Sequence, residues 1–210
     1  MNISDILVPI IDKYSKNTNK KLVWLPTSRH INIQTLTPDE VGDVGEELIF
    51  TTLKNSGNYD VTWSKKTKNK EYDVKAKNKT NKRNHRIEVK TATLGNSTSS
   101  FQHDGLKKHR KFDNIIFVDI GPDDMYITCS TKEELPWLEA STNPLVPRKS
   151  KMTVRENGDY KYDLMLKQVK NNLITNETDF LVSFSDMEKR LAIQRMALAQ
   201  TKRATRAIKV

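Results

Sequence analysis

The sequence predicts an α/β (α+β) fold with a central mixed β-sheet flanked by helices and a helical C-terminal extension. Three observations lead to this class. A capped amphipathic helix comes first, segments with the two-residue alternation of β-strands follow it, and helical periodicity returns near the C-terminus. With 210 residues the chain can bury one sizeable core, and its apolar runs are spread along its length. We therefore expect a globular protein.

The clearest helix is expected at residues 37–57. Thr37 and Glu40 have the spacing of a capping box, in which each residue satisfies a free backbone N–H of the other. Gly42 and Gly45 are less expected, since each glycine costs a helix about 1 kcal/mol relative to alanine. Their spacing indicates that another element or a ligand approaches closely near the first turns.

The remaining elements are predicted from periodicity and turn residues. Strands are expected at 59–64, 71–77, 85–94, 114–120 and 125–130, with the last two forming a hairpin. Further helices are expected at 3–14 (interrupted near Pro9), 105–112, 162–174 and 185–209. Residues 21–27 are expected to form a short strand or buried segment, and residues 131–160 to be irregular.

We divide the chain into three parts that belong to one compact domain. These are an N-terminal segment (1–36), a core (37–130) and a C-terminal extension (131–210) that is first irregular and then helical. No internal repeat and no long Gly, Ser or Pro linker separates them.

The charge of the chain predicts a polyanionic partner. The formal net charge is +10, and the cations cluster at residues 65–90, 107–111 and 189–209. Such clusters favour nucleic acid, ahead of an acidic membrane surface, with solubility alone as the alternative. The longest N-terminal apolar run is too short to be a signal or to span a membrane. We expect a cytoplasmic protein without a membrane partner.

Several chemistries lack their motifs. Cys129 is the single cysteine, which excludes a disulfide or a zinc knuckle within one chain. The sequence has no Walker loop, no G-x-G-x-x-G and no H-x-x-x-H pair. Of the scattered histidines, His85 and His103 are expected at the surface.

An acidic and basic cluster is predicted on two neighbouring strands. In residues 85–94, Glu88 and Lys90 share one face, and Asp73 can lie beside Glu88 if the preceding strand pairs as a hairpin. Two carboxylates on one face repel each other unless a cation lies between them, and Mg²⁺ or Mn²⁺ prefers such oxygen ligands. Lys90 could then orient an attacking water and offset charge on a phosphate. The alternative is a solvated strand face held by mutual salt bridges.

The helix at 37–57 adds a further acid. Glu46 precedes apolar residues at i+3, i+4 and i+7, so it lies on the core-facing side, whereas Glu47 lies on the wetter side. A carboxylate beside an apolar stripe needs a partner, and a metal site would supply one. A Glu46 that reaches water at the edge of the stripe is the equal alternative, and the choice between the two glutamates stays open.

A helix with an acid, an Asp on one strand and E-V-K on the next resemble the PD-(D/E)XK nuclease superfamily. The matching residues are Glu46, Asp73, Glu88 and Lys90, and Tyr72 stands where the motif has proline. The resemblance covers about residues 37–130, which would form a restriction-endonuclease-like core. It implies catalytic roles for these four residues, and its implied metal ligands are Asp73, Glu88 and Val89.

The following residues are similar to the second half of that core in type II restriction endonucleases, where an aromatic-Gln pair precedes a helix and an apolar strand. Here that pair is Phe101 and Gln102. We expect Gln102, Lys107, Lys108 and Arg110 to contact DNA.

The resemblance implies a Mg²⁺-dependent endonuclease that hydrolyses phosphodiester bonds in double-stranded DNA and leaves a 5′-phosphate, with Mn²⁺ as a substitute. A sequence-specific restriction-modification enzyme acting as a homodimer is expected, because a twofold protein matches a palindromic site. The alternatives are a junction resolvase or a phage or repair nuclease of the same superfamily. A non-catalytic basic nucleic-acid-binding protein with salt-bridged acids also remains open.

Overall fold

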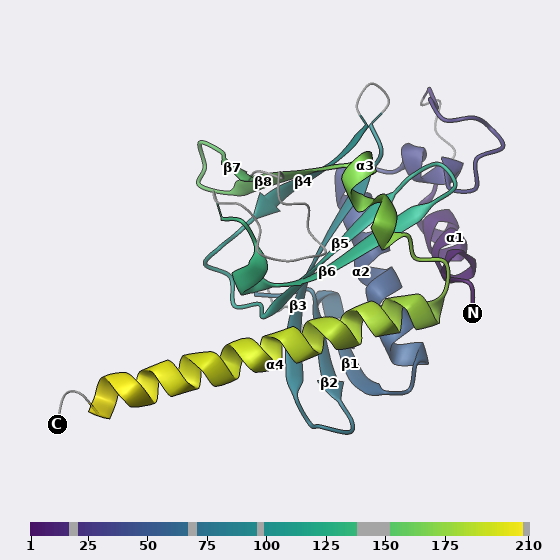
Figure 1. The fold of residues 1–210 in the computed structure, drawn as a ribbon. Helices are drawn as coiled ribbons and strands as arrows, with labels where there is room; N and C mark the ends of the chain where they lie inside the picture. Colours follow the sequence, from purple (N-terminus) through teal and green to yellow (C-terminus); the bar gives the residue numbers. More distant parts are fainter. Residues whose placement is uncertain (17–20, 67–70, 96–98, 138–151, 208–210) are drawn as a thin grey trace.

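The computed structural model describes residues 1–16, 21–66, 71–95, 99–137 and 152–207. They form a mixed α+β structure of three layers, which confirms the predicted class. Helices cover one face of a central five-stranded sheet, and a three-stranded antiparallel sheet covers the other (Figure 1). A hydrophobic core fills each of the two interfaces between layers.

The central sheet has the strand order β1-β2-β3-β5-β6. Its members are β1 (Tyr59–Trp63), β2 (Val74–Asn78), β3 (Asn84–Thr93), β5 (Asn114–Ile120) and β6 (Met125–Thr131). Only β3 and β5 pair in parallel, so the sheet is mixed. The five expected strands are confirmed, although β2 begins three residues later than the predicted segment. Every residue of β5 and β6 is buried, as expected for central strands covered on both faces.

Helix α2 (Pro38–Asn55) begins with the predicted capping box between Thr37 and Glu40. Helix α1 (Ile3–Tyr14) continues through Pro9, so the expected interruption there is wrong. A buried face holds α1 together across the lost hydrogen bond; its apolar members are Ile3, Ile6, Leu7, Ile10 and Ile11. Helix α4 (Glu177–Ala207) begins eight residues earlier than the C-terminal helix predicted at 185–209.

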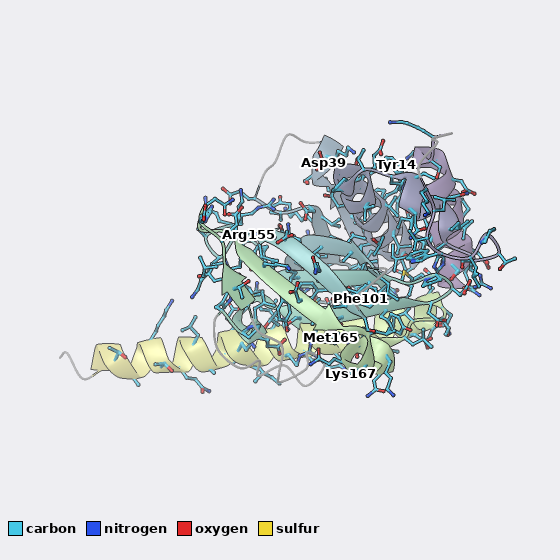
Figure 2. All side chains as sticks on the ribbon, turned by 90° about the horizontal axis from the view of Figure 1, so that it is seen from above. Tyr14, Asp39, Phe101, Arg155, Met165 and Lys167 are labelled. Atoms are coloured by element: carbon cyan, nitrogen blue, oxygen red, sulfur yellow. The ribbon has the colours of Figure 1, made fainter. Side chains whose placement is uncertain are left out.

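The second sheet replaces two predicted helices. It has the order β4-β8-β7, with β4 (Ser100–Leu106), β7 (Met152–Val154) and β8 (Tyr160–Met165) all antiparallel. Residues 105–112 therefore end a strand and form a turn instead of a helix. Residues 162–174 contain most of β8, a short α3 (Leu166–Val169) and a 3₁₀ turn. Figure 2 shows Phe101 of β4 and Met165 of β8 on this sheet.

Short 3₁₀ helices complete the described structure: η1 (Ile31–Thr35), η2 (Ser64–Lys66), η3 (Lys132–Glu134) and η4 (Lys170–Asn172). Residues 21–27 form turns and no strand. Of the segment expected to be irregular, residues 138–151 lie outside the described residues, and β7 follows them. The division of the chain at 36 and 130 stays a prediction, and β4 from the central part pairs with β8 from the C-terminal part.

In the described ranges, the structure contains no helix with the length and apolarity needed to cross a membrane.

Candidate active site

The β2–β3 hairpin brings the predicted strand acids together. Asp73 directly precedes β2, and its backbone N–H donates to the carbonyl of Ile87 at 2.9 Å. The side chain turns toward the next residues of β3, where its Oδ2 accepts a 2.8 Å hydrogen bond from the backbone N–H of Val89. The antiparallel register thus fixes the Asp73 carboxylate beside Glu88.

Glu88 is almost completely buried, with 1% of its surface exposed. Its Oε1 lies 3.1 Å from Nζ of Lys90, which shares its face of β3. Its Oε2 is buried and has no hydrogen-bond partner within the described part of the chain. An unpaired buried carboxylate oxygen is costly, so this atom has capacity for a further cation or donor.

Arg110 is the second cation at the acidic pair. Its Nη1 donates to Glu88 Oε1 at 2.5 Å, and its Nη2 lies 3.6 Å from Asp73 Oδ1. It comes from the turn after β4, and Nζ of Lys132 donates to its carbonyl at 2.5 Å, which ties this turn to η3. The guanidinium thus bridges the two carboxylates that sequence reasoning assigns to a metal.

The electrostatics of Glu88 follow from this environment. Burial raises the pKa of Glu88, and the neighbouring charge of Asp73 raises it further, whereas Lys90 and Arg110 oppose the rise. The net shift is upward. Positive charge that approaches the pair therefore stabilises it.

Of the two glutamates considered on α2, Glu46 is the one that senses the strand acids. Burial raises the pKa of Glu46 to about 7, with the charge of Asp73 as the next contribution, while a 2.8 Å hydrogen bond from Trp63 Nε1 lowers it. Glu47 instead accepts hydrogen bonds from Lys13 Nζ and Tyr14 Oη at 2.7 and 2.9 Å.

Close contact between α2 and β3 explains one of the helix glycines. A Cβ at Gly45 would lie only 1.8 Å from Oγ1 of Thr91. Only glycine therefore lets the α2 backbone approach β3 at this distance. The contact sets Glu46, the next residue of α2, close to the β2–β3 hairpin.

The residues predicted to contact DNA lie at several places. Gln102 is exposed on β4 and lines a cavity of about 600 Å³, together with the C-terminal end of β3 and the first turn of α2. Lys107 and Lys108 are exposed in the turn after β4. Arg110 points at the acidic pair and has only 17% of its side chain exposed.

Two buried histidine pairs were not predicted, and the expectation that these histidines lie at the surface is wrong. His103 Nε2 lies 2.7 Å from Asp119 Oδ1 between the two sheets, with both side chains fully buried. His85 Nε2 lies 2.7 Å from Glu188 Oε1 beneath α4. Isolated polar residues inside apolar runs were the available signal: His103 alternates with the exposed Gln102, and Asp119 ends an apolar strand.

The oxygen atoms at the hairpin suit a hard divalent ion. Asp73 and Glu88 offer carboxylates, and Glu88 Oε2 is the buried atom without a partner. Among the described residues, no group of three His, Cys, Asp or Glu side chains is arranged to hold a metal. The remaining ligands would be a backbone carbonyl such as that of Val89, solvent or phosphate.

Neither a protein-family description nor a curated protein sequence matches this chain. Among solved structures, it is similar to a bacterial homing endonuclease, I-Ssp6803I, with 14% sequence identity and a TM-score of 0.33. The match covers 42% of this chain and 66% of that protein, slightly less than two thirds of its length. A likeness this distant establishes neither a family nor an activity.

Proposed function

We propose that this protein is a DNA endonuclease that depends on a divalent metal and has a PD-(D/E)XK site. The observation that carries the proposal is the meeting of Asp73, Glu88 and Lys90 on one hairpin, with Glu88 buried and one of its oxygens unpartnered. A solvated salt bridge on a strand face would leave its acid exposed to water. A carboxylate pair withdrawn from solvent instead requires compensating positive charge.

Asp73, Glu88 and the carbonyl of Val89 would hold Mg²⁺, or Mn²⁺ in its place. The ion would supply positive charge that polarises the scissile phosphate and lowers the pKa of water. For Glu88 and Asp73 to become ligands, the guanidinium of Arg110 must give up its contacts with them.

Lys90 and Glu46 provide the protein's own charges beside this pair. The ammonium of Lys90 lies 3.1 Å from Glu88, with 20% of its side chain exposed, so it is available to a bound phosphate. There it would stabilise negative charge that develops in the transition state, an effect of about 3–4 kcal/mol for one well-placed donor. Because the pKa of Glu46 is about 7, its carboxyl can accept a proton near neutral pH.

The substrate in this proposal is duplex DNA, cut at a specific sequence by a homodimer of restriction-modification type. The net charge of +10 supports a polyanionic substrate. The exposed side chains of Gln102, Lys107 and Lys108 would contact the DNA. Arg110 would contact a phosphate once it has left the carboxylates.

The proposal is tested by incubating the protein with long DNA of mixed sequence and Mg²⁺. Discrete fragments indicate specific cleavage, a smear indicates nonspecific cleavage, and selective cutting of branched DNA indicates a junction resolvase. Glu88→Ala and Lys90→Ala should each slow the single-turnover rate about a thousandfold, equivalent to about 4 kcal/mol. Both variants should keep the wild-type circular dichroism spectrum and bind DNA in EDTA. Wild-type cleavage in both variants would refute the site.

A second candidate function is supported by Arg110. Because Arg110 and Lys90 already compensate Glu88, the same geometry suits a nucleic-acid-binding protein without catalysis. Such a protein would bind DNA equally well in Mg²⁺ and EDTA and would leave it intact. Metal dependence therefore separates the two functions.

A further inference from the structure

Helix α4 consists of two parts with different surroundings. In its first part the apolar residues Phe180, Phe184, Met187 and Leu191 are buried and follow one face at i, i+4, i+7 and i+11. Glu188 fixes the helix to the sheet, because Tyr59 Oη donates to Oε2 at 2.9 Å and His85 Nε2 lies 2.7 Å from Oε1. This part crosses the β2–β3 hairpin (Figure 1).

The second part of α4 has no packing against the rest of the chain. Every described side chain from Arg195 to Thr205 is exposed. Figures 1 and 2 both show this end of the helix extending beyond the other elements. A helical segment of this length is only marginally stable in water without a partner. The extension is therefore a surface that gains from binding.

The buried face of the first part becomes basic in the second. Continuing the spacing from Phe180 by 15, 18 and 22 residues leads to Arg195, Leu198 and Lys202. Arg195 reaches back to Asp113, at 3.0 Å, and Lys202 is exposed. The face that holds an apolar core near Phe184 thus presents cations where the helix leaves the body.

The chemistry of the sequence selects the occupant. Residues 189–210 contain seven Lys and Arg residues and no Asp or Glu. Two copies of this segment packed side by side would bring like charges together, which is unfavourable. A regular polyanion instead gains from every cation it meets.

The neighbouring hairpin supplies a second basic surface. The turn between β2 and β3 exposes Lys79, Lys82 and Arg83. A cavity of about 210 Å³ lies between it and α4, with Arg83 and Arg195 in its lining. The turn and the helix extension therefore form one basic surface with two elements.

We propose that the extension of α4, together with the β2–β3 turn, binds the phosphate backbone of DNA. The proposal deepens the proposed function, because it assigns a backbone-binding surface for the same substrate outside the acidic site. It does not depend on catalysis. β3 carries both sites, since His85 holds α4 at one end of the strand and Glu88 lies three residues further on.

The test compares Arg195→Gln/Lys202→Gln with a matched control, Lys167→Gln/Lys170→Gln. The control removes two exposed lysines at and after α3, and Figure 2 shows Lys167 far from the C-terminal end of α4. Affinity for a mixed-sequence duplex is measured in EDTA between 50 and 200 mM salt. Each lost phosphate contact lowers the salt slope by about 0.9, so the fall in affinity over this range should shrink about tenfold in the first variant. The control should match the wild type.

Two results would overturn the proposal. One is a salt slope for the α4 variant equal to that of the control. The other is a wild-type dimer that the α4 variant dissociates in sedimentation equilibrium while DNA affinity stays unchanged, which would make the extension a contact between copies of the chain. Because the DNA is never cut in EDTA, a protein without nuclease activity can still pass this test. Failure of the nuclease proposal is thus distinguishable from failure of this one.

Discussion

Replacing Arg110 with Gln tests whether the acidic pair is a cation site. Arg110 lies 2.5 Å from Glu88 Oε1 and 3.6 Å from Asp73 Oδ1. At an effective dielectric constant of 20, these separations correspond to gross attractions of about 5–7 kcal/mol each, before the cost of desolvation. Breaking one partner of a buried pair costs about 3–5 kcal/mol net. Because the Arg110 side chain is 17% exposed, we expect about 3 kcal/mol of lost stability at pH 8 in EDTA.

Mg²⁺ should restore part of this loss. Without Arg110, the two carboxylates repel each other and are free to take an ion. An ion that binds only the folded state stabilises it by about 1.4 kcal/mol at ten times its dissociation constant. In the wild-type protein the ion must first displace Arg110, so its stabilisation should be smaller. Urea unfolding with and without Mg²⁺ measures both quantities.

Arg86→Gln is the matched control. Arg86 lies at the same hairpin and makes a bidentate pair with Asp113 at 2.9 and 2.8 Å, but its listed partner is not Asp73 or Glu88. This variant should lose stability equally in EDTA and Mg²⁺. Equal Mg²⁺ responses in Arg110→Gln and Arg86→Gln would refute the reasoning, because Asp73 and Glu88 would then be ordinary salt-bridge partners.

Two further variants test other parts of the site. The pKa of Glu46 is raised to about 7, so burying its charge costs stability above that pH and costs nothing once pH falls below its unfolded value of about 4.5. Glu46→Gln should therefore raise the free energy of unfolding at pH 8, by at most about 3 kcal/mol, with the gain lost at pH 4; an equal effect at both pH values would contradict the assigned charge. Gln102→Ala should slow cleavage if the amide holds a phosphate or a water near the end of β3, and an unchanged single-turnover rate would make Gln102 an ordinary surface residue.

Local signals in the sequence predict much of the site. The capping box of Thr37 and Glu40 marks the start of α2, and the alternation of residues 85–94 marks β3 and its two faces. Because side chains alternate strictly along a strand, the shared face of Glu88 and Lys90 follows from the sequence alone. The hairpin that adds Asp73 follows from the basic turn between two alternating segments.

Contacts made by distant segments could not be predicted in this way. The basic residues after Gly105 favoured a helix, yet β4 pairs with β8, whose Leu164 is the register partner of Phe101. Pairing over such a separation decides strand structure more strongly than local propensity. Arg110 reaches Glu88 only because β4 and its turn return over the central sheet. A cation that arrives from another layer leaves no mark in the spacing of the acids.

The position of Arg110 reconciles the burial of the acidic pair with a function that requires charge. A buried Glu88 without compensation would cost the fold stability, and Lys90 alone leaves Oε2 and Asp73 unsatisfied. Arg110 supplies that compensation from a turn, which can move more easily than a strand of the central sheet. A phosphate backbone attracts the guanidinium, and a divalent ion satisfies the carboxylates that it leaves. DNA and metal binding should therefore reinforce each other in the wild-type protein, and Arg110→Gln should weaken this coupling while leaving the binding of the ion itself intact.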